Sequence, residues 1–292
     1  MNAASKRSRR SRKKISGKMI FRAHIPSSPL DQFIEIMICY EGVQHEHKVD
    51  RFLPNGDTEI LIDFHDAPQF VYDNDTLKEI QACNHVWASG VRTEPITIPS
   101  GTNSAMMVIA FKKGKAAPFF PFPMNEISDS IVDADLIWGS DFGDLREQLL
   151  GTNDFDLRFV MVEQFLVRKF HRQLDLNPCV AFAVSEMTNN PDQISIARMN
   201  AKIGYSQKHF TDMFRRQVGV TPKSYLKIMR FQKAVHTIAT ATATATDWSR
   251  ISQDCGFYNQ AHFINDFNHF SGFTPAKYAE IQLNYQNYIP VG

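Results

Sequence analysis

The C-terminal third of the chain contains an internal repeat, and this repeat constrains the fold more than any other feature. A shift of 53 residues superimposes residues 205–225 on residues 258–278 with nine identities in 21 positions. The identical pairs are Tyr205/Tyr258, Gln207/Gln260, His209/His262, Phe210/Phe263, Phe214/Phe267, Gly219/Gly272, Thr221/Thr274, Pro222/Pro275 and Tyr225/Tyr278. A repeat of this kind indicates two copies of one structural unit.

Each copy is typical of two short helices joined by a tight turn. In the first copy a helix over about residues 195–203 ends at Gly204, because glycine adopts the left-handed conformation without steric cost. Ser206 then offers a hydroxyl to cap a second helix, which buries Phe210 and Phe214 on one face and ends at Gly219. The second copy places a helix at about 247–255, Gly256, Asn259, Phe263, Phe267 and Gly272 in the same roles. This is the pattern of a helix-turn-helix.

The segment between the two units predicts a long central helix. Residues 224–239 are mostly helix formers, with Ile228, Phe231, Val235 and Ile238 on one face. Such a helix is about 24 Å long. A stiff spacer of that length suits two recognition helices in successive major grooves, which lie about 34 Å apart.

The full motif resembles the AraC/XylS family of bacterial transcription regulators over roughly residues 181–282. It runs from Gly204 through Gly219-x-Thr-Pro, Arg230 and Gly256 to Gly272-x-Thr-Pro and Tyr278. The resemblance implies a DNA-binding domain with two helix-turn-helix units on a central helix. The preceding segment, with its Pro-Asn-Gly turn and residues 118–138, also resembles an uncharacterised N-terminal domain that some members carry.

Side chains opposite the buried faces of the two second helices are the candidates for DNA contact. The base-facing candidates are Gln207, Lys208, Thr211, Asp212, Gln260, Ala261 and Asn265, of which Lys208, Thr211, Asp212, Ala261 and Asn265 match positions that approach bases in the family. Gln and Asn pair with adenine, and Lys with guanine. Ile264 and Asn268 are also expected to face outward. The phosphate candidates are Arg198, Lys202, Arg215, Arg216, Lys223 and Lys227.

Three departures from the family pattern bear on the second unit and on base reading. Asp212 stands where relatives often carry Arg, and its carboxylate repels phosphate. Asn200 and Ser252 replace the alanines that allow close helix packing. Residues 240–246 alternate Thr and Ala, and Thr is a poor helix former, so a mobile loop is expected there.

Residues 19–135 predict a small, mostly antiparallel β-domain. Residues 59–64 alternate at period two, and the Pro54-Asn55-Gly56-Asp57 stretch before them is a turn signal. Further strands are expected at 33–40, 69–72, 85–89, 95–98 and 105–111. The predicted fold class is α+β, with an antiparallel β-domain, a helical linker and an all-α C-terminal domain.

Residues 136–180 carry apolar side chains at helical spacing and are expected to form the helical linker. One stripe combines Phe159, Val162, Phe165, Leu166 and Phe170. Such a stripe either packs in a core or forms a dimer interface, and the sequence alone leaves both readings open.

Charge is distributed unevenly along the 292 residues, although the formal net charge is only +1. Residues 1–18 carry +8, residues 19–180 carry −11 and residues 181–292 carry +4. The first segment is expected to be a flexible basic arm that binds phosphate or serves only as a leader, and residues 283–292 a C-terminal tail. This asymmetry favours a polyanionic partner for the C-terminal domain.

Several function classes are disfavoured. Apolar runs fall far short of the roughly 20 residues that cross a bilayer, no secretory signal is visible, and the four cysteines are scattered, so we expect a cytoplasmic, nucleoid-associated protein without a membrane partner. His45 and His47 alternate on an expected strand, but surface histidines explain them better than a metal site. No catalytic motif or cofactor loop appears, so we expect no enzyme, no cofactor and no metal.

Two function hypotheses follow. The first is a sequence-specific transcription regulator that binds double-stranded DNA, with an N-terminal domain that senses an effector or mediates dimerisation. The second is a protein-interaction module that keeps the fold and has lost specific DNA reading. RNA polymerase, a small-molecule effector and a second copy of the chain are the further candidate partners.

Overall fold

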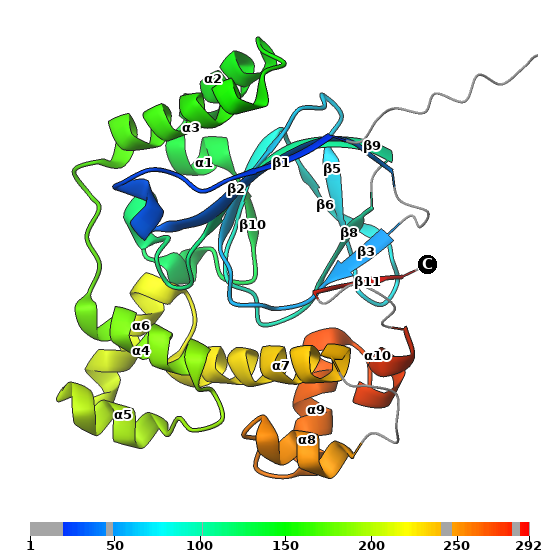
Figure 1. The fold of residues 1–292 in the computed structure, drawn as a ribbon, viewed down its shortest axis with the longest axis vertical. Helices are drawn as coiled ribbons and strands as arrows, with labels where there is room; N and C mark the ends of the chain where they lie inside the picture. The colour runs from blue at the N-terminus through cyan, green and yellow to red at the C-terminus, as the bar shows by residue number, and fades with distance from the viewer. Residues whose placement is uncertain (1–19, 45–48, 101, 241–246, 282–286, 292) are drawn as a thin grey trace, which may run out of the picture.

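The computed structural model describes residues 20–44, 49–100, 102–240, 247–281 and 287–291. Within them an N-terminal β-rich part and a C-terminal helical part lie against each other (Figure 1). This confirms the predicted α+β class. The basic arm, the His45/His47 pair and most of the Thr/Ala segment lie outside the described residues.

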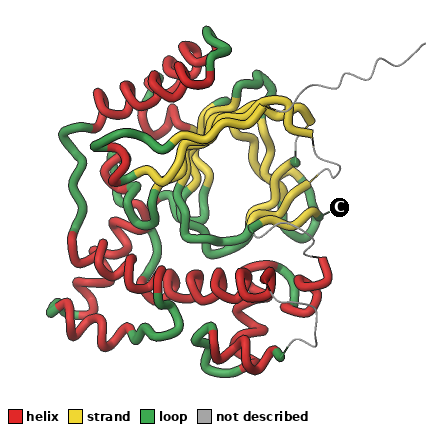
Figure 2. Tube along the Cα trace, in the orientation of Figure 1, coloured by secondary structure: helices red, strands yellow, loops and turns green. Residues whose placement is uncertain are grey.

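The β-rich part contains two antiparallel sheets. Sheet A has the order β1-β2-β9-β4-β7-β10 and sheet B the order β11-β3-β8-β5-β6. The strands of sheet A are β1 (Ile20–His24), β2 (Ile34–Gln44), β9 (Thr102–Phe111), β4 (Glu59–Asp63), β7 (Val86–Ser89) and β10 (Ile131–Asp133). The strands of sheet B are β11 (Tyr288–Pro290), β3 (Val49–Phe52), β8 (Ile96–Pro99), β5 (Gln69–Tyr72) and β6 (Glu79–Cys83). Figure 2 shows the two sheets facing each other across the domain.

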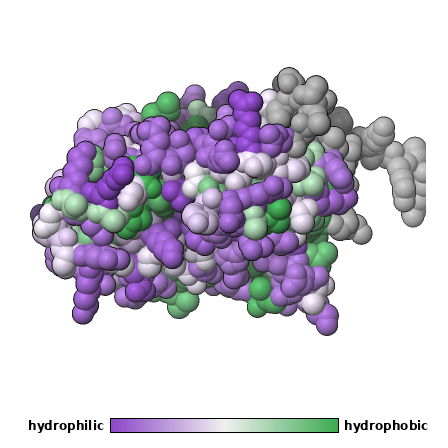
Figure 3. Space-filling view, turned by 90° about the horizontal axis from the view of Figure 1, so that it is seen from below, coloured by the Kyte–Doolittle hydropathy of each residue, from purple (hydrophilic) through white to green (hydrophobic). Residues whose placement is uncertain are grey.

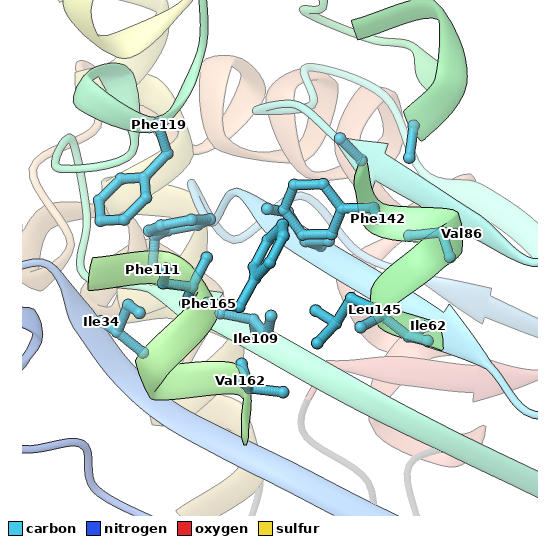
Figure 4. Close-up of a cluster of buried hydrophobic side chains, with 14 of the residues drawn as sticks. Ile34, Ile62, Val86, Ile109, Phe111, Phe119, Phe142, Leu145, Val162 and Phe165 are labelled. Atoms are coloured by element: carbon cyan, nitrogen blue, oxygen red, sulfur yellow. The ribbon is translucent and has the colours of Figure 1, made fainter. Parts of the chain in front are cut away.

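Helices cover one face of sheet A and close its core. They are α1 (Ala134–Trp138), α2 (Asp141–Leu150) and α3 (Phe155–Phe170), beside three short 3-10 turns at Leu30–Gln32, Ala117–Phe119 and Met124–Glu126. Ile62 and Ile109 from the strands pack with Phe142 and Val162 from the helices, all fully buried (Figure 4). Burial of these apolar side chains supplies the main driving force for this layer.

The helical stripe expected in residues 136–180 lies in this core. Phe159, Val162, Phe165, Leu166 and Phe170 are buried against sheet A. The stripe is therefore core, because sheet A covers that face, and dimerisation through the rest of this segment stays a prediction. The start of the expected helical segment is divided into α1 and α2, since Gly139 between them adopts a φ of +64°.

The C-terminal part is all-α except for its last strand. Its helices are α4 (Pro178–Asn189), α5 (Ile196–Ile203), α6 (Gln207–Val218), α7 (Pro222–Thr240), α8 (Trp248–Asp254), α9 (Gln260–Ser271) and α10 (Pro275–Ile281). Figure 1 shows α7 running between α4–α6 on one side and α8–α10 on the other. The predicted central helix is thus present and slightly longer than expected.

The end of the chain returns to the β-domain. Residues 288–290 of the expected tail form β11, which pairs antiparallel with β3, so that Tyr288 opposes Phe52 and Ile289 opposes Arg51. The Leu53 amide donates to the Asn287 carbonyl (2.8 Å), and the Val291 amide donates to the Val49 carbonyl (3.0 Å). None of the helices in the described ranges is long and apolar enough to span a membrane.

Candidate nucleic-acid interface

The first helix-turn-helix unit is built from α5 and α6. The Ser195 hydroxyl caps α5, and Gly204 ends it in the left-handed conformation with φ +80°. The chain then turns within two residues, and the Ser206 Oγ accepts from the His209 amide at 3.2 Å to begin α6. Both helix starts satisfy amides that the helix leaves without a partner.

The second unit, α8 and α9, uses the same construction. The Asp247 carboxylate caps α8 by accepting from the Arg250 amide (3.0 Å), and Gly256 follows with φ +81°. The Asn259 Oδ1 then accepts from the His262 amide at 2.8 Å. The turn chemistry predicted from the repeat therefore occurs in both units.

Aromatic contacts inside the two units also repeat. The Phe210 and Phe214 rings meet edge to face at 5.8 Å, and Phe263 and Phe267 do so at 5.7 Å. Phe214 contacts Tyr225 at 5.7 Å, and Phe267 contacts Tyr278 at 5.3 Å. All of these rings are buried. Edge-to-face pairs fix ring orientation, so each second helix has a defined rotation about its axis.

That rotation decides which side chains are presented to solvent. Thr211 is half-buried, and the other base-facing candidates are exposed. The exposed candidates are Gln207, Lys208, Asp212, Gln260, Ala261 and Asn265. Asn268 is exposed as well, whereas Ile264 is half-buried against the core of the C-terminal domain. Ile264 is thus only partly exposed, like Thr211 at the matching position of the first unit.

The phosphate candidates divide into two groups. Arg198, Lys202, Arg215, Arg216 and Lys223 are exposed. Lys227 instead donates from its Nζ to the Asp266 carboxylate of α9 at 2.9 Å. The structure places Lys227 in an ion pair between α7 and α9, where it fixes the second unit on the central helix.

Sequence reasoning missed the partner of this lysine. Asp266 is 8% exposed and also lies 3.1 Å from the His262 Nε2. The repeat contained a signal for it, since Asp266 aligns with Met213, a side chain of the first unit that packs on the core. A carboxylate at a core position requires a cation or hydrogen-bond donors.

The central helix is further tied to the loop before α5. Arg230 donates from Nε to the Pro191 carbonyl (3.0 Å) and from Nη2 to the Ile194 carbonyl (3.2 Å), and burial lowers its pKa. Lys233 pairs with Asp192 at 2.7 Å, and this hydrogen bond lowers the pKa of the Asp192 carboxyl. These contacts explain why the motif includes a basic residue at position 230.

The surface around the two units is polar. Figure 3, seen from below the view of Figure 1, shows mostly hydrophilic residues with scattered hydrophobic patches. Two exposed aromatics precede the recognition helices at matching positions, Tyr205 at 44% and Tyr258 at 90% exposure. The sequence repeat contained this pair, but its exposure depends on the turn geometry.

The departures Asn200 and Ser252 lie inside the units. Ser252 is 1% exposed and Asn200 is half-buried. The Asn200 Oδ1 and the Ser252 Oγ are buried and have no hydrogen-bond partner among the described residues. Each unit therefore carries one unsatisfied polar atom at the position where alanine was expected.

Comparisons with known proteins agree with this architecture. Residues 199–281 match the family described as a helix-turn-helix domain, and residues 22–133 match a domain of unknown function, DUF6597. The chain is 30% identical over 86 residues to the probable transcriptional regulator LumQ of Photobacterium leiognathi, which covers 30% of this chain and 34% of LumQ. It is 28% identical over 101 residues to the transcriptional activator RhaS of Escherichia coli O139:H28, covering 28% of this chain and 35% of RhaS.

The matched region thus spans about a third of the length of these curated relatives. Among solved structures, ToxT from Vibrio cholerae O395 aligns with 89% of this chain and 97% of its own, at 11% identity and a TM-score of 0.41. The chain therefore carries a C-terminal helix-turn-helix domain of the AraC type behind an N-terminal DUF6597 domain.

Proposed function

We propose that this protein is a sequence-specific transcription regulator that inserts α6 and α9 into successive major grooves of double-stranded DNA. The main observation behind this proposal is that α6 and α9, on either side of α7, are built alike. Both helices begin at a capping side chain, both are oriented by buried aromatic rings, and both have an exposed polar face. With 19 residues, α7 is about 28 Å long, which is comparable to one turn of DNA. The regulatory roles of LumQ and RhaS support the proposal.

The exposed side chains of α6 and α9 have hydrogen-bonding groups and methyl groups that suit particular bases in each major groove. In α6, Lys208 would donate to guanine and Gln207 to adenine, while Asp212 accepts from a cytosine amino group and disfavours other bases. In α9, Gln260 and Asn265 would pair with adenine, and Ala261 would contact a thymine methyl group. Exposed Arg215 and Arg216 at the end of α6 would bind phosphate.

The test begins with a duplex that the full-length protein selects from a random-sequence library. We expect Lys208→Ala to weaken binding to that duplex by about 1–3 kcal/mol and to relax specificity at one position. Arg215→Ala should weaken binding to all sequences alike and reduce the salt slope by about one contact. Lys277→Ala, which removes an exposed lysine of α10, is the matched control.

The same experiment decides between the two function hypotheses. A protein-interaction module would select no sequence and would show no salt-dependent binding to any duplex. The formal +4 charge of residues 181–292 and the exposure of both recognition faces favour the regulator. Action on chromosomal DNA would place the protein in the cytoplasm on the nucleoid.

The N-terminal domain is proposed to sense a small-molecule effector between its two sheets. On the helix-covered face of sheet A, Ile60 and Ile109 are fully buried, whereas Leu61 and Val108 on the opposite face are only half-buried. Glu59 shares that inner face, and burial, followed by the charge of Asp57, raises its pKa to about 7. A thermal-shift screen of small amines and apolar compounds, repeated on Glu59→Gln, tests this role.

A homodimer and RNA polymerase are the remaining proposed partners. The outer face of α3 exposes Leu157 and Val160, each at 46%, and is available to a second copy. Light scattering of the wild type and of Leu157→Asp measures whether that face joins two copies. In vitro transcription from a promoter carrying the selected duplex shows whether the polymerase responds.

A further inference from the structure

The two recognition helices end at glycines that occupy the same position of the repeat. Gly219 closes α6 with φ +106°, and Gly272 closes α9 with φ +77°. Both glycines contact the N-terminal domain, although they belong to different units. These two contacts and the return of the last strand are the basis of the inference.

At the end of α6 the contact is a hydrogen bond. The Ser128 hydroxyl, which follows the 3-10 turn of residues 124–126, donates to the Gly219 carbonyl at 2.6 Å. A Cβ placed on Gly219 would lie 2.8 Å from the Ser128 Oγ and 3.3 Å from the Met124 carbonyl oxygen. Gln217 adds a second bond, because its Nε2 donates to the Gly114 carbonyl at 3.2 Å.

At the end of α9 the contact is a buried cation. Arg51 of β3 is 7% exposed, and its Nη1 would lie 2.5 Å from a Cβ placed on Gly272. Its guanidinium carbon lies 5.5 Å from the centre of the Phe273 ring. Its remaining nitrogens donate to the Thr97 hydroxyl (3.3 Å) and to the Asn74 carbonyl, so β8 and the loop after β5 hold it in place.

The chemistry of both contacts suits the end of a helix. The last carbonyls of a helix lack intrahelical partners and carry the negative end of the helix dipole. A hydroxyl donor at α6 and a cation at α9 both stabilise that end. Neither contact covers the exposed side chains at the start of α6 and α9.

The end of the chain adds a third attachment beside Arg51. Through β11, the segment that follows α10 joins sheet B, and Ile289 lies opposite Arg51 in the register. The Phe52 and Tyr288 rings stack at 5.4 Å on the neighbouring pair. The second unit is thus attached to sheet B at Gly272 and Phe273, and again through β11.

We propose that the N-terminal domain holds both recognition helices by their terminal glycines and thereby sets the distance between them. Ser128 and Arg51 are the positioning residues, one for each helix. The biological meaning of this inference rests on the proposed DNA-binding function, whereas the distance between α6 and α9 is set in the protein without DNA.

The geometric test measures the distance between α6 and α9 without DNA. Spin labels on Asp212→Cys and Asn265→Cys, two exposed positions that match in the repeat, are placed in a Cys179→Ser background, since the other three cysteines are buried. We expect a narrow distance distribution that broadens in Arg51→Ala and in Ser128→Ala. Arg146→Ala is the control, because this arginine is equally buried in the N-terminal domain and donates only within it among the described residues.

The functional test uses the selected duplex with one base pair inserted between its half-sites. The insertion should weaken wild-type binding about tenfold and the binding of Arg51→Ala less than about threefold, because a loosened second unit follows the displaced groove. An unchanged distance distribution in both variants overturns the proposal, as does equal broadening in Arg146→Ala. If the distribution broadens and no duplex is ever selected, the positioning stands and the DNA-binding function fails.

Discussion

Replacing Ser252 by alanine should stabilise the protein, although the side chain is 1% exposed and lies in the second helix-turn-helix unit. Its Oγ is buried without a hydrogen-bond partner in the described part of the chain. An unsatisfied buried hydroxyl costs about 1–3 kcal/mol. Removing one oxygen atom leaves a small cavity worth about 0.3 kcal/mol. The expected net gain in the free energy of unfolding is therefore about 1 kcal/mol.

Urea unfolding followed by tryptophan fluorescence measures this change. Trp248 begins α8, four positions before Ser252, and stacks on Phe263 with 6.5 Å between the rings, so its emission reports on this unit. A gain of this size corresponds to an increase of roughly 2–4 °C in the melting temperature.

Ser271→Ala is the matched control. Ser271 is fully buried too, but its Oγ donates to the Phe267 carbonyl (2.7 Å) and accepts from the Phe273 amide (3.0 Å). Its removal takes the acceptor from the Phe273 amide and the additional donor from the Phe267 carbonyl, and should cost about 1–2 kcal/mol. A Ser252→Ala variant that is as destabilised as Ser271→Ala would refute the reasoning, because it would show that the Ser252 hydroxyl is satisfied.

Three further predictions follow from named contacts. Gly272→Ala should lower the free energy of unfolding by at least about 1–2 kcal/mol, because alanine is strained at φ +77° and its Cβ would displace Arg51. Chemical denaturation of the variant measures this loss, and an unchanged free energy contradicts the contact between Gly272 and Arg51. Lys227→Ala should destabilise the protein by about 1 kcal/mol yet leave the salt slope of DNA binding unchanged, whereas a reduced slope would make Lys227 a phosphate contact after all. Because the pKa of Glu59 is raised to about 7, the folded state holds a proton on this carboxyl at pH values where the unfolded state has lost it. The free energy of unfolding should therefore fall as the pH rises from about 4.5 to about 7, and Glu59→Gln should flatten that part of the stability profile. An unchanged stability profile in Glu59→Gln contradicts the assignment.

The C-terminal units could be predicted closely because their signals are local. Each unit has a glycine that ends its first helix and, two or three residues later, a side chain that caps its second helix. These residues are Gly204 and Ser206 in the first unit and Gly256 and Asn259 in the second, and all four have the expected role. Strand β4 was likewise visible in the alternating apolar residues of 59–64, and a strand was expected at residues 105–111, which lie in β9. Local chemistry of this kind needs no knowledge of distant partners.

Other features depend on contacts between distant parts of the chain. The α3 stripe could pack on a sheet or on a second copy, and only the position of sheet A decides between them. The three-residue β11 carries no pattern of its own and exists because β3 offers an unpaired edge more than 230 residues earlier. The role of Lys227 likewise depended on where α9 places Asp266. The specific base contacts stay predictions.

The attachment of an acidic domain to a DNA-binding domain raises an electrostatic question, since residues 19–180 carry a formal charge of −11. The position of the contacts answers it. The N-terminal domain meets both recognition helices at their C-terminal glycines, whereas DNA would approach the exposed N-terminal halves, where the helix dipole is positive. At those contacts the domain presents a hydroxyl, Ser128, and a cation, Arg51, rather than one of its carboxylates. An acidic partner can therefore stabilise the recognition helices and leave the phosphate-facing ends free of its own negative charge.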